Sequence, residues 1–181
     1  MLKGYWFIKR VIKHKGFDIF RSDIIFNLQK ILSALKIEVK ILSLYEFQEE
    51  FMRHFQDNKE AQIINEKVPQ SFIHAGKSSP GIVAINFDSI IRDILQFEDR
   101  NNIELSLNGI LCILFIAALH EYGESKFNYK HCDDEKCPMF PDQPFARSEP
   151  LLWPYSPCKN HTELNRYLSH PIIAEIKIQD R

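Results

Sequence analysis

The feature that most limits how this chain can fold lies between residues 120 and 161, where side chains that bind metal ions recur at short intervals. Cys132 and Cys137 are separated by four residues, and Cys158 and His161 are separated by two. Two ligand pairs with such spacings are typical of a tetrahedral zinc site. The segment is also rich in proline, so a metal crosslink would hold a region that packing alone does not order.

Three thiolates and one imidazole form a closed ligand set, which suits a structural zinc ion. His161 is the weakest member of this set, because Asp133, Asp134 or His131 could take its place. The alternative is that the residues are unrelated, a free thiol pair and a surface histidine, but the repeated short spacing favours the metal site. Cys112, the fourth cysteine, lies in an apolar segment and is expected to be an inert core thiol.

A second group of candidate ligands comes before the cysteines. His120, Glu121 and Glu124 form the pattern His-Glu-x-x-Glu, which is the HExxH motif of zinc proteases with its second histidine replaced. In that motif the two outer side chains bind the metal from one helix face, and the inner glutamate acts as general base. Glutamate is an accepted zinc ligand, although its negative charge would weaken the activation of water. The alternative is an ordinary polar turn at the end of a helix.

Length and composition indicate a protein of about one domain, with 181 residues of which 45% are hydrophobic. The net charge of −1 gives no broad attraction to anionic lipid or to nucleic acid, which disfavours a nucleic-acid-binding module. The basic N-terminal residues are interleaved with aromatic ones, a pattern typical of a strand and not of a secretory signal. The longest apolar stretch, Ile110 to Leu119, is too short to span a bilayer. We therefore expect a cytoplasmic protein with no nucleic-acid partner and no membrane partner.

The first half of the sequence alternates strand-like and helix-like patterns. Strands are predicted at residues 5–12, 37–41, 81–87 and 103–107. Helices are predicted at residues 22–35, with Ser22 as N-cap, and at residues 45–66 and 90–97. Loops are predicted at residues 68–69 and 76–80. The continuous apolar strand at 81–87 is expected in the centre of a mostly parallel sheet.

The longest predicted helix begins after Ser106 or Asn108 as N-cap and runs to about Phe127. Its apolar stretch is expected to be buried on all sides, so that His120 and the residues after it emerge where the core meets a cleft. Beyond it, the chain is expected to be irregular until a last helix near residues 162–168. The predicted fold class is therefore α/β (α+β).

Several fixed spacings together resemble the archaemetzincins, a family of zinc metallopeptidase-like proteins. Their signature is HExxHxxGxxH followed directly by a cysteine, then C-x4-C-x-M and a downstream CxxC. The matching residues are His131, Cys132, Cys137, Met139 and Cys158. The resemblance is close over roughly residues 107–168, and the strand and helix order upstream is compatible with it.

The departures from the family pattern are specific. Glu124 stands where the family has its second metal-binding histidine, and His131 lies one residue later than the third. A single inserted residue before Asn128 would explain that offset, with Asn128 taking the left-handed conformation that the family's glycine supplies. One extra helical residue turns the chain that follows by about 100°, so the catalytic metal site is expected to be altered or lost. The fourth structural cysteine of the family becomes His161.

The resemblance implies a metzincin-like fold in one domain over residues 1–181, with a mixed twisted sheet and a long active-site helix up to residue 127. An irregular region at residues 128–181 would be stabilised by zinc. The implied structural zinc ligands are Cys132, Cys137, Cys158 and His161. The implied catalytic zinc ligands are His120, Glu124 and His131, with Glu121 as general base. The expected function is a zinc metallopeptidase with an altered site; the alternative is a non-catalytic relative that binds a peptide or protein partner.

Overall fold

A computed structural model of the chain describes residues 17–43, 45–47, 49, 76–79, 82–141 and 155–178. The strands in this part are β1 (Lys40–Leu42), β2 (Gly76–Ser79) and β3 (Ile82–Asn86). The helices are α2 (Phe17–Ala34), α4 (Phe87–Asn101), α5 (Leu107–Phe127), α6 (Asn165–Leu168) and α7 (Pro171–Ile178), with a 3-10 turn η3 (Thr162–Leu164). The predictions for residues 5–12, for most of 45–66 and for 68–69 lie outside the described residues.

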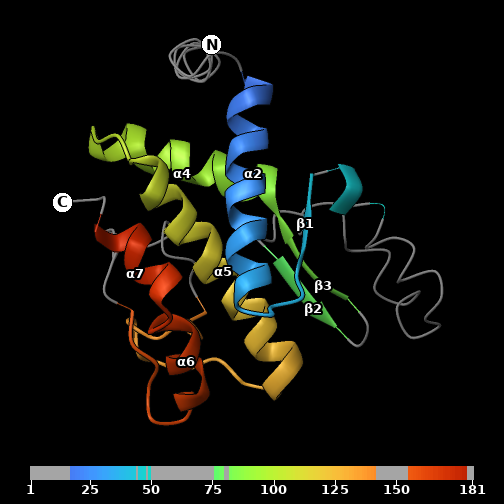
Figure 1. The fold of residues 1–181 in the computed structure, drawn as a ribbon, viewed down its shortest axis with the longest axis vertical. Helices are drawn as coiled ribbons and strands as arrows, with labels where there is room; N and C mark the ends of the chain where they lie inside the picture. The colour runs from blue at the N-terminus through green and yellow to red at the C-terminus, as the bar shows by residue number, and fades with distance from the viewer. Residues whose placement is uncertain are drawn as a thin grey trace.

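The described strands form one small mixed sheet in the order β1-β3-β2 (Figure 1). The prediction that the apolar strand near residues 81–87 lies in the centre is confirmed, because β3 pairs with both neighbours. The prediction of a loop at residues 76–80 is wrong, since Gly76–Ser79 pairs antiparallel with β3. Only two residues separate β2 from β3, and so short a connection joins antiparallel neighbours, which makes the sheet mixed and not mostly parallel.

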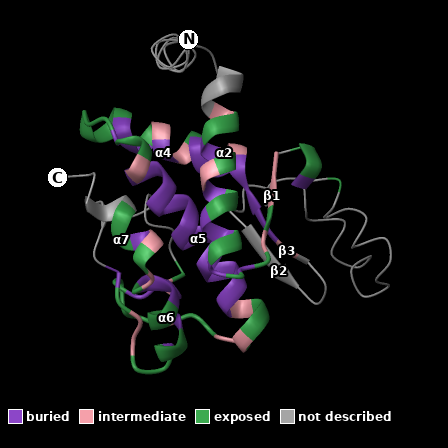
Figure 2. Cartoon of the chain, in the orientation of Figure 1, coloured by how far each residue is buried: buried purple, intermediate pink, exposed green. Residues whose placement is uncertain are grey.

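Helix α5 is the core of the molecule and contacts α2, α4, α7 and two of the strands (Figure 1). Its residues from Gly109 to Gly123 are all buried, and it is the most continuously buried element in Figure 2. The predicted cap is confirmed, because the Ser106 side chain accepts a hydrogen bond from the N–H of Gly109 at 3.0 Å. The apolar stretch alone is too short to cross a membrane, but the whole helix α5 is long and apolar enough. Of its most apolar 18-residue segment, 83% is buried inside the protein.

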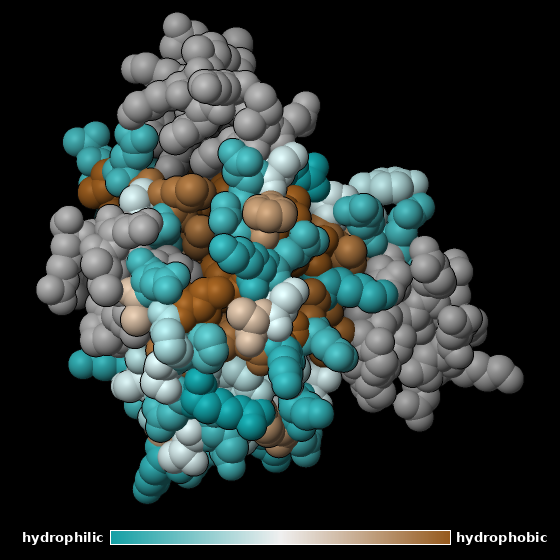
Figure 3. All heavy atoms as spheres, in the orientation of Figure 1, coloured by the Kyte–Doolittle hydropathy of each residue, from teal (hydrophilic) through white to brown (hydrophobic). Residues whose placement is uncertain are grey.

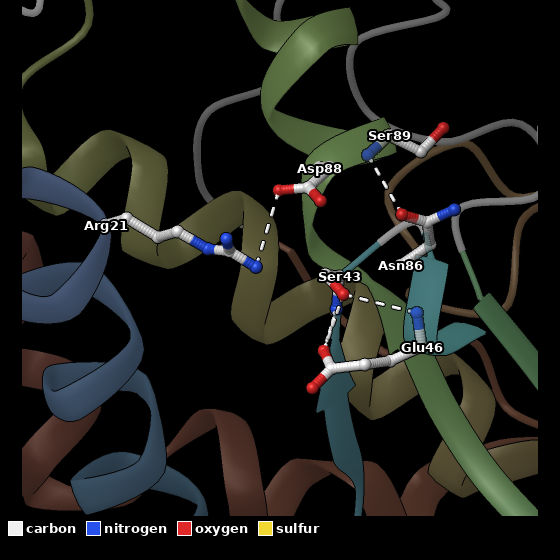
Figure 4. Close-up of polar contacts among 6 residues, drawn as sticks. All are labelled: Arg21, Ser43, Glu46, Asn86, Asp88 and Ser89. Carbon is white, nitrogen blue, oxygen red and sulfur yellow. Dashed lines mark hydrogen bonds and ion pairs between the residues drawn. The ribbon is translucent and has the colours of Figure 1, made fainter. Parts of the chain in front are cut away.

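Other helix boundaries differ from the predictions. Helix α2 begins at Phe17 and includes Ser22, so Ser22 is not its N-cap. Helix α4 is longer than predicted and begins after Asn86, whose side chain accepts from the N–H of Ser89 at 3.1 Å (Figure 4). In the same close-up, Nη2 of Arg21 in α2 lies 3.7 Å from Oδ1 of Asp88 in the first turn of α4, and this ion pair connects the two helices. Helix α7 was not predicted.

The segment predicted as a strand at residues 103–107 forms no strand: residues 103–106 lie in the connection from α4 to α5, and Leu107 begins α5. Asn102 adopts the left-handed conformation and ends α4. The buried carboxylate of Glu98 then accepts the N–H of Leu105 at 2.7 Å. Because that N–H is bonded to a side chain, it is not available to a neighbouring strand.

The face presented in Figure 3 carries both polar and apolar side chains where α2 lies. Among the side chains of α2 that the structure describes, from Arg21 onward, the largest apolar exposure is that of Phe26, with 68% of its surface accessible. The opposite side of α2, with Ile24, Leu28 and Leu32, is buried in the core. Helix α2 thus covers α5 with one face only.

A left-handed turn ends α5 and redirects the chain. Asn128 has φ 54° and ψ 37°, as predicted for the position of the family's glycine. The N–H groups of Asn128 and Tyr129 both donate to the carbonyl of Gly123, one turn back in the helix. This turn carries His131 back toward the end of α5.

We expect Asn128→Ala to lower the free energy of unfolding by about 1 kcal/mol, because alanine pays for a left-handed conformation that asparagine tolerates. Asn128→Gly should stay within a few tenths of a kcal/mol of the natural protein, since glycine adopts this conformation without strain. Urea denaturation measures both. The matched control is Lys126→Ala, an exposed site within α5, which should change stability little. Equal stability of Asn128→Ala and Asn128→Gly would contradict the turn.

Candidate metal centres

The four residues predicted to hold a structural zinc lie together. The ligand atoms of Cys132, Cys137, Cys158 and His161 are all within 4.8 Å of one another. Nδ1 of His161 lies 3.1 Å from Sγ of Cys158 and 3.3 Å from Sγ of Cys137. For a tetrahedral zinc ion with bond lengths of about 2.3 Å to sulfur and 2.0 Å to nitrogen, the sulfur–nitrogen separation is about 3.5 Å. The cluster, which we call the Cys3His site, therefore has the spacing of ligands around one ion.

Two of the three alternatives to His161, Asp134 and His131, are engaged elsewhere. The side chain of Asp134 accepts the N–H of Lys136, and its carbonyl accepts the N–H of Cys137, so Asp134 builds the turn between the two cysteines. His131 belongs to a different group of ligands. His161 itself is held by its N–H, which donates to the carbonyl of Cys158 in a tight turn before η3.

The chemistry of the Cys3His site fits zinc. All three of its cysteines are free thiols. Burial raises the pKa of Cys132, and burial raises the pKa of Cys137 to about 12, so both keep their protons at neutral pH until a cation replaces them. Soft thiolate ligands in a tetrahedral group with one imidazole select zinc among the common divalent ions. The cluster can hold a metal ion, and zinc is the plausible one.

The second group of ligands also comes together, and we call it the His-Glu-His site. Oε1 of Glu124 lies 3.6 Å from Nε2 of His120 and 3.0 Å from Nε2 of His131. All three donor atoms are within 4.8 Å of one another. His131 thus lies beside His120 and Glu124, because the left-handed turn at Asn128 directs the chain back toward the end of α5.

The His120 ring is oriented by a backbone carbonyl. Its Nδ1 lies 2.8 Å from the carbonyl oxygen of Pro138. A carbonyl oxygen can only accept, so Nδ1 must carry a proton, and in the neutral ring the lone pair of Nε2 faces Glu124. Histidine ligands of metal ions typically donate their other ring nitrogen in this way. Burial disfavours the charged form of His120, but the nearby carboxylates of Glu124 and Glu121 and the carbonyl of Pro138 together outweigh it and raise the pKa of His120.

The His-Glu-His site is closed on one side and open on the other. The exposed fraction of the side chain is 7% for His120, 28% for Glu124 and 49% for His131. Glu121, the residue predicted as general base, is buried beside His120 in α5. A metal ion held here would keep contact with solvent on the His131 side.

Two residues that shape the His-Glu-His site were not found from the sequence. Pro138 acts through its main-chain carbonyl, which leaves no signal in residue type. Gly123 lies against the buried side chain of Met139, and a Cβ at that position would be 2.8 Å from the methionine sulfur. A glycine inside a helix costs about 1 kcal/mol relative to alanine, so its presence was the available hint of a close contact.

Comparison of the chain with models of protein families, with curated proteins and with solved structures finds no match. The two groups of ligands themselves therefore provide the evidence on function.

We expect Cys137→Ala to lose the tightly bound metal ion and to lower the free energy of unfolding by more than about 3 kcal/mol, because a ligand that binds only the folded chain stabilises it. The measurements are metal content per chain and urea denaturation in reducing buffer. Cys112→Ala is the matched control: it removes another buried sulfur, from α5, and should cost about 1 kcal/mol with the metal retained. Equal metal content in the two variants would contradict the Cys3His site.

Gly123→Ala tests the contact between α5 and Met139. Alanine is the better helix former by about 1 kcal/mol, but the clash with a buried side chain typically costs 1–3 kcal/mol, about as much or more. We expect a net loss of about 1 kcal/mol in the free energy of unfolding. In a double-mutant cycle with Met139→Ala, the cost of Gly123→Ala should disappear or change sign. An unchanged cost in the absence of the methionine would place the strain elsewhere.

Proposed function

We propose that this protein is a zinc-dependent hydrolase of the archaemetzincin type that cleaves peptides. The Cys3His site would hold a structural zinc ion, and the His-Glu-His site would hold a catalytic one. The observation that supports this most is the position of His131, which lies close to His120 and Glu124 although the sequence departs from the family pattern between them.

The ligand set and its exposure suit a catalytic site. Two histidines and one glutamate are a set found in catalytic zinc sites, where three protein ligands leave a fourth position open. When bound, a zinc ion would supply Lewis acidity to polarise a peptide carbonyl or a water molecule. The three ligands are arranged around a site that is open on the side of His131, where a substrate could approach.

Glu121 is the candidate general base. It directly follows His120, as in zinc protease helices, and its carboxylate is buried near the His120 ring. There it would take a proton from the attacking water and pass it to the leaving amine. The thiolate ligands of the Cys3His site require a reducing compartment, which supports the proposal that the protein acts in the cytoplasm.

A second candidate function is that of a non-catalytic relative that binds a peptide or protein partner. The observation that favours it is the 3.0 Å contact between Glu124 and His131, together with the contact of Glu124 with His120. These contacts let the three polar groups satisfy one another without an ion. A site of this kind could persist after hydrolysis has been lost.

We expect Glu121→Gln to reduce the rate of peptide hydrolysis by about 10²–10⁴-fold, because the amide cannot accept a proton from water. Zinc content should stay at that of the natural protein, since Glu121 is not a ligand. The assay is cleavage of a mixture of unstructured peptides, followed by mass spectrometry. Glu175→Gln is the matched control, an exposed glutamate of α7, and should leave hydrolysis unchanged. Two bound zinc ions without any cleavage in the natural protein would contradict the enzyme and favour the binding protein.

A further inference from the structure

The two groups of ligands share one short stretch of chain. His131 of the His-Glu-His site directly precedes Cys132 of the Cys3His site. Pro138, whose carbonyl accepts the proton of His120 Nδ1, directly follows Cys137. His131 is therefore itself covalently joined to a thiol ligand of the other site, and His120 is oriented by a residue that is joined to one.

Met139 provides a further connection between the two sites. Its carbonyl accepts the N–H of Cys132 at 3.2 Å, which closes the segment from 132 to 139 into a loop. Its side chain is fully buried and lies against Gly123, on the helical turn that bears Glu124. The loop that carries two thiol ligands is thus packed directly on the helix that carries the other site.

Tyr129 connects His161 to the turn after α5. The Tyr129 and His161 rings meet edge to face, with centroids 4.6 Å apart. The N–H of Tyr129 donates to the carbonyl of Gly123 in the left-handed turn that leads to His131. An ion that fixes the His161 ring would also fix the ring of Tyr129, and with it the path of the chain to His131.

The loop has no regular secondary structure to order it. Residues 132–139 contain no helix or strand, and the four residues between the two cysteines are exposed. Fixing the backbone of one residue costs about 1–2 kcal/mol of conformational entropy, so ordering such a loop requires a strong constraint. The three thiols and the imidazole can supply that constraint when they bind one ion.

We propose that the Cys3His site is the positioning element of the His-Glu-His site, so that an ion bound in the first site raises the affinity of the second site for its own ion. The inference rests on the proposed function only in using the same second site, and it does not require hydrolysis. Groups that orient a metal ligand typically change metal affinity by about 10–100-fold when they are lost. We expect a loss of that size at the His-Glu-His site when the Cys3His site is empty.

Titration with Co²⁺ alone tests the order of binding, because thiolate ligands give an intense charge-transfer absorption that histidine and glutamate do not. In the natural protein this absorption should be complete after the first equivalent, and the second equivalent should add only weak visible bands. Cys158→Ala should weaken binding at the His-Glu-His site by about 10–100-fold, although Cys158 adjoins none of its residues. Glu124→Ala should keep the full thiolate absorption, and Cys112→Ala should bind both ions in the natural order.

A measurement on the natural protein avoids any variant that fails to fold. One equivalent of Zn²⁺ should bring the Nδ1 proton of His120 into slow exchange in a nitrogen–proton NMR spectrum, since Pro138 then accepts it firmly. The proposal is overturned if Cys158→Ala binds the second ion with unchanged affinity, if the second site fills first, or if the Nδ1 proton does not respond. Ordered binding of two ions without hydrolysis would overturn the proposed function alone. A single bound ion would overturn both.

Discussion

The hydrogen bond between His120 and Pro138 joins the buried core helix α5 to a loop that has no regular secondary structure. One partner belongs to the helix that forms the core, and the other belongs to a loop without regular structure. Because α5 is packed on several sides, its geometry is set by the core, and the loop has to adapt to it. The carbonyl of Pro138 therefore indicates where the loop must lie for both ligand sites to form.

Burial separates these polar groups from an ordinary helix end. Ser125 and Lys126, in the last turn of α5, are exposed as in any surface turn, whereas His120 and Glu121 are each only 5% exposed. Burying such groups costs free energy unless partners compensate it, and a chain that needed only a soluble helix end would place them outside. For His120 the partners are the carboxylate of Glu124 and the carbonyl of Pro138, which compensate the cost of burying its ring.

The sequence predicted the elements whose signals are local. Ser106 and the apolar run after it define the start and path of α5, and the apolar segment at β3 defines a central strand. Strand β2 was not predicted because its four residues, GKSS, and the proline that follows them favour a loop by residue type. Only their pairing with β3 makes them a strand. Helix α7 was missed although Pro171 at its first position is a usual start signal. The ligand pairs were readable from spacing, but the closure of each site was not, since it depends on the turn at Asn128 and on the path of the loop.

The loop between the cysteines explains why spacing carries so much of the signal. Its four middle residues, 133–136, are exposed, while Cys137, Pro138 and Met139 are buried. The exposed residues contribute mainly the length and the turn that bring Cys137 back beside Cys132. The hydrogen bond from the N–H of Cys137 to the carbonyl of Asp134 closes that turn. The side chain of Asp134 supports this turn by accepting the N–H of Lys136. A change of length would move a thiol ligand, the carbonyl that orients His120 and the methionine beside Gly123 together. One fixed gap in the sequence thus constrains both groups of ligands.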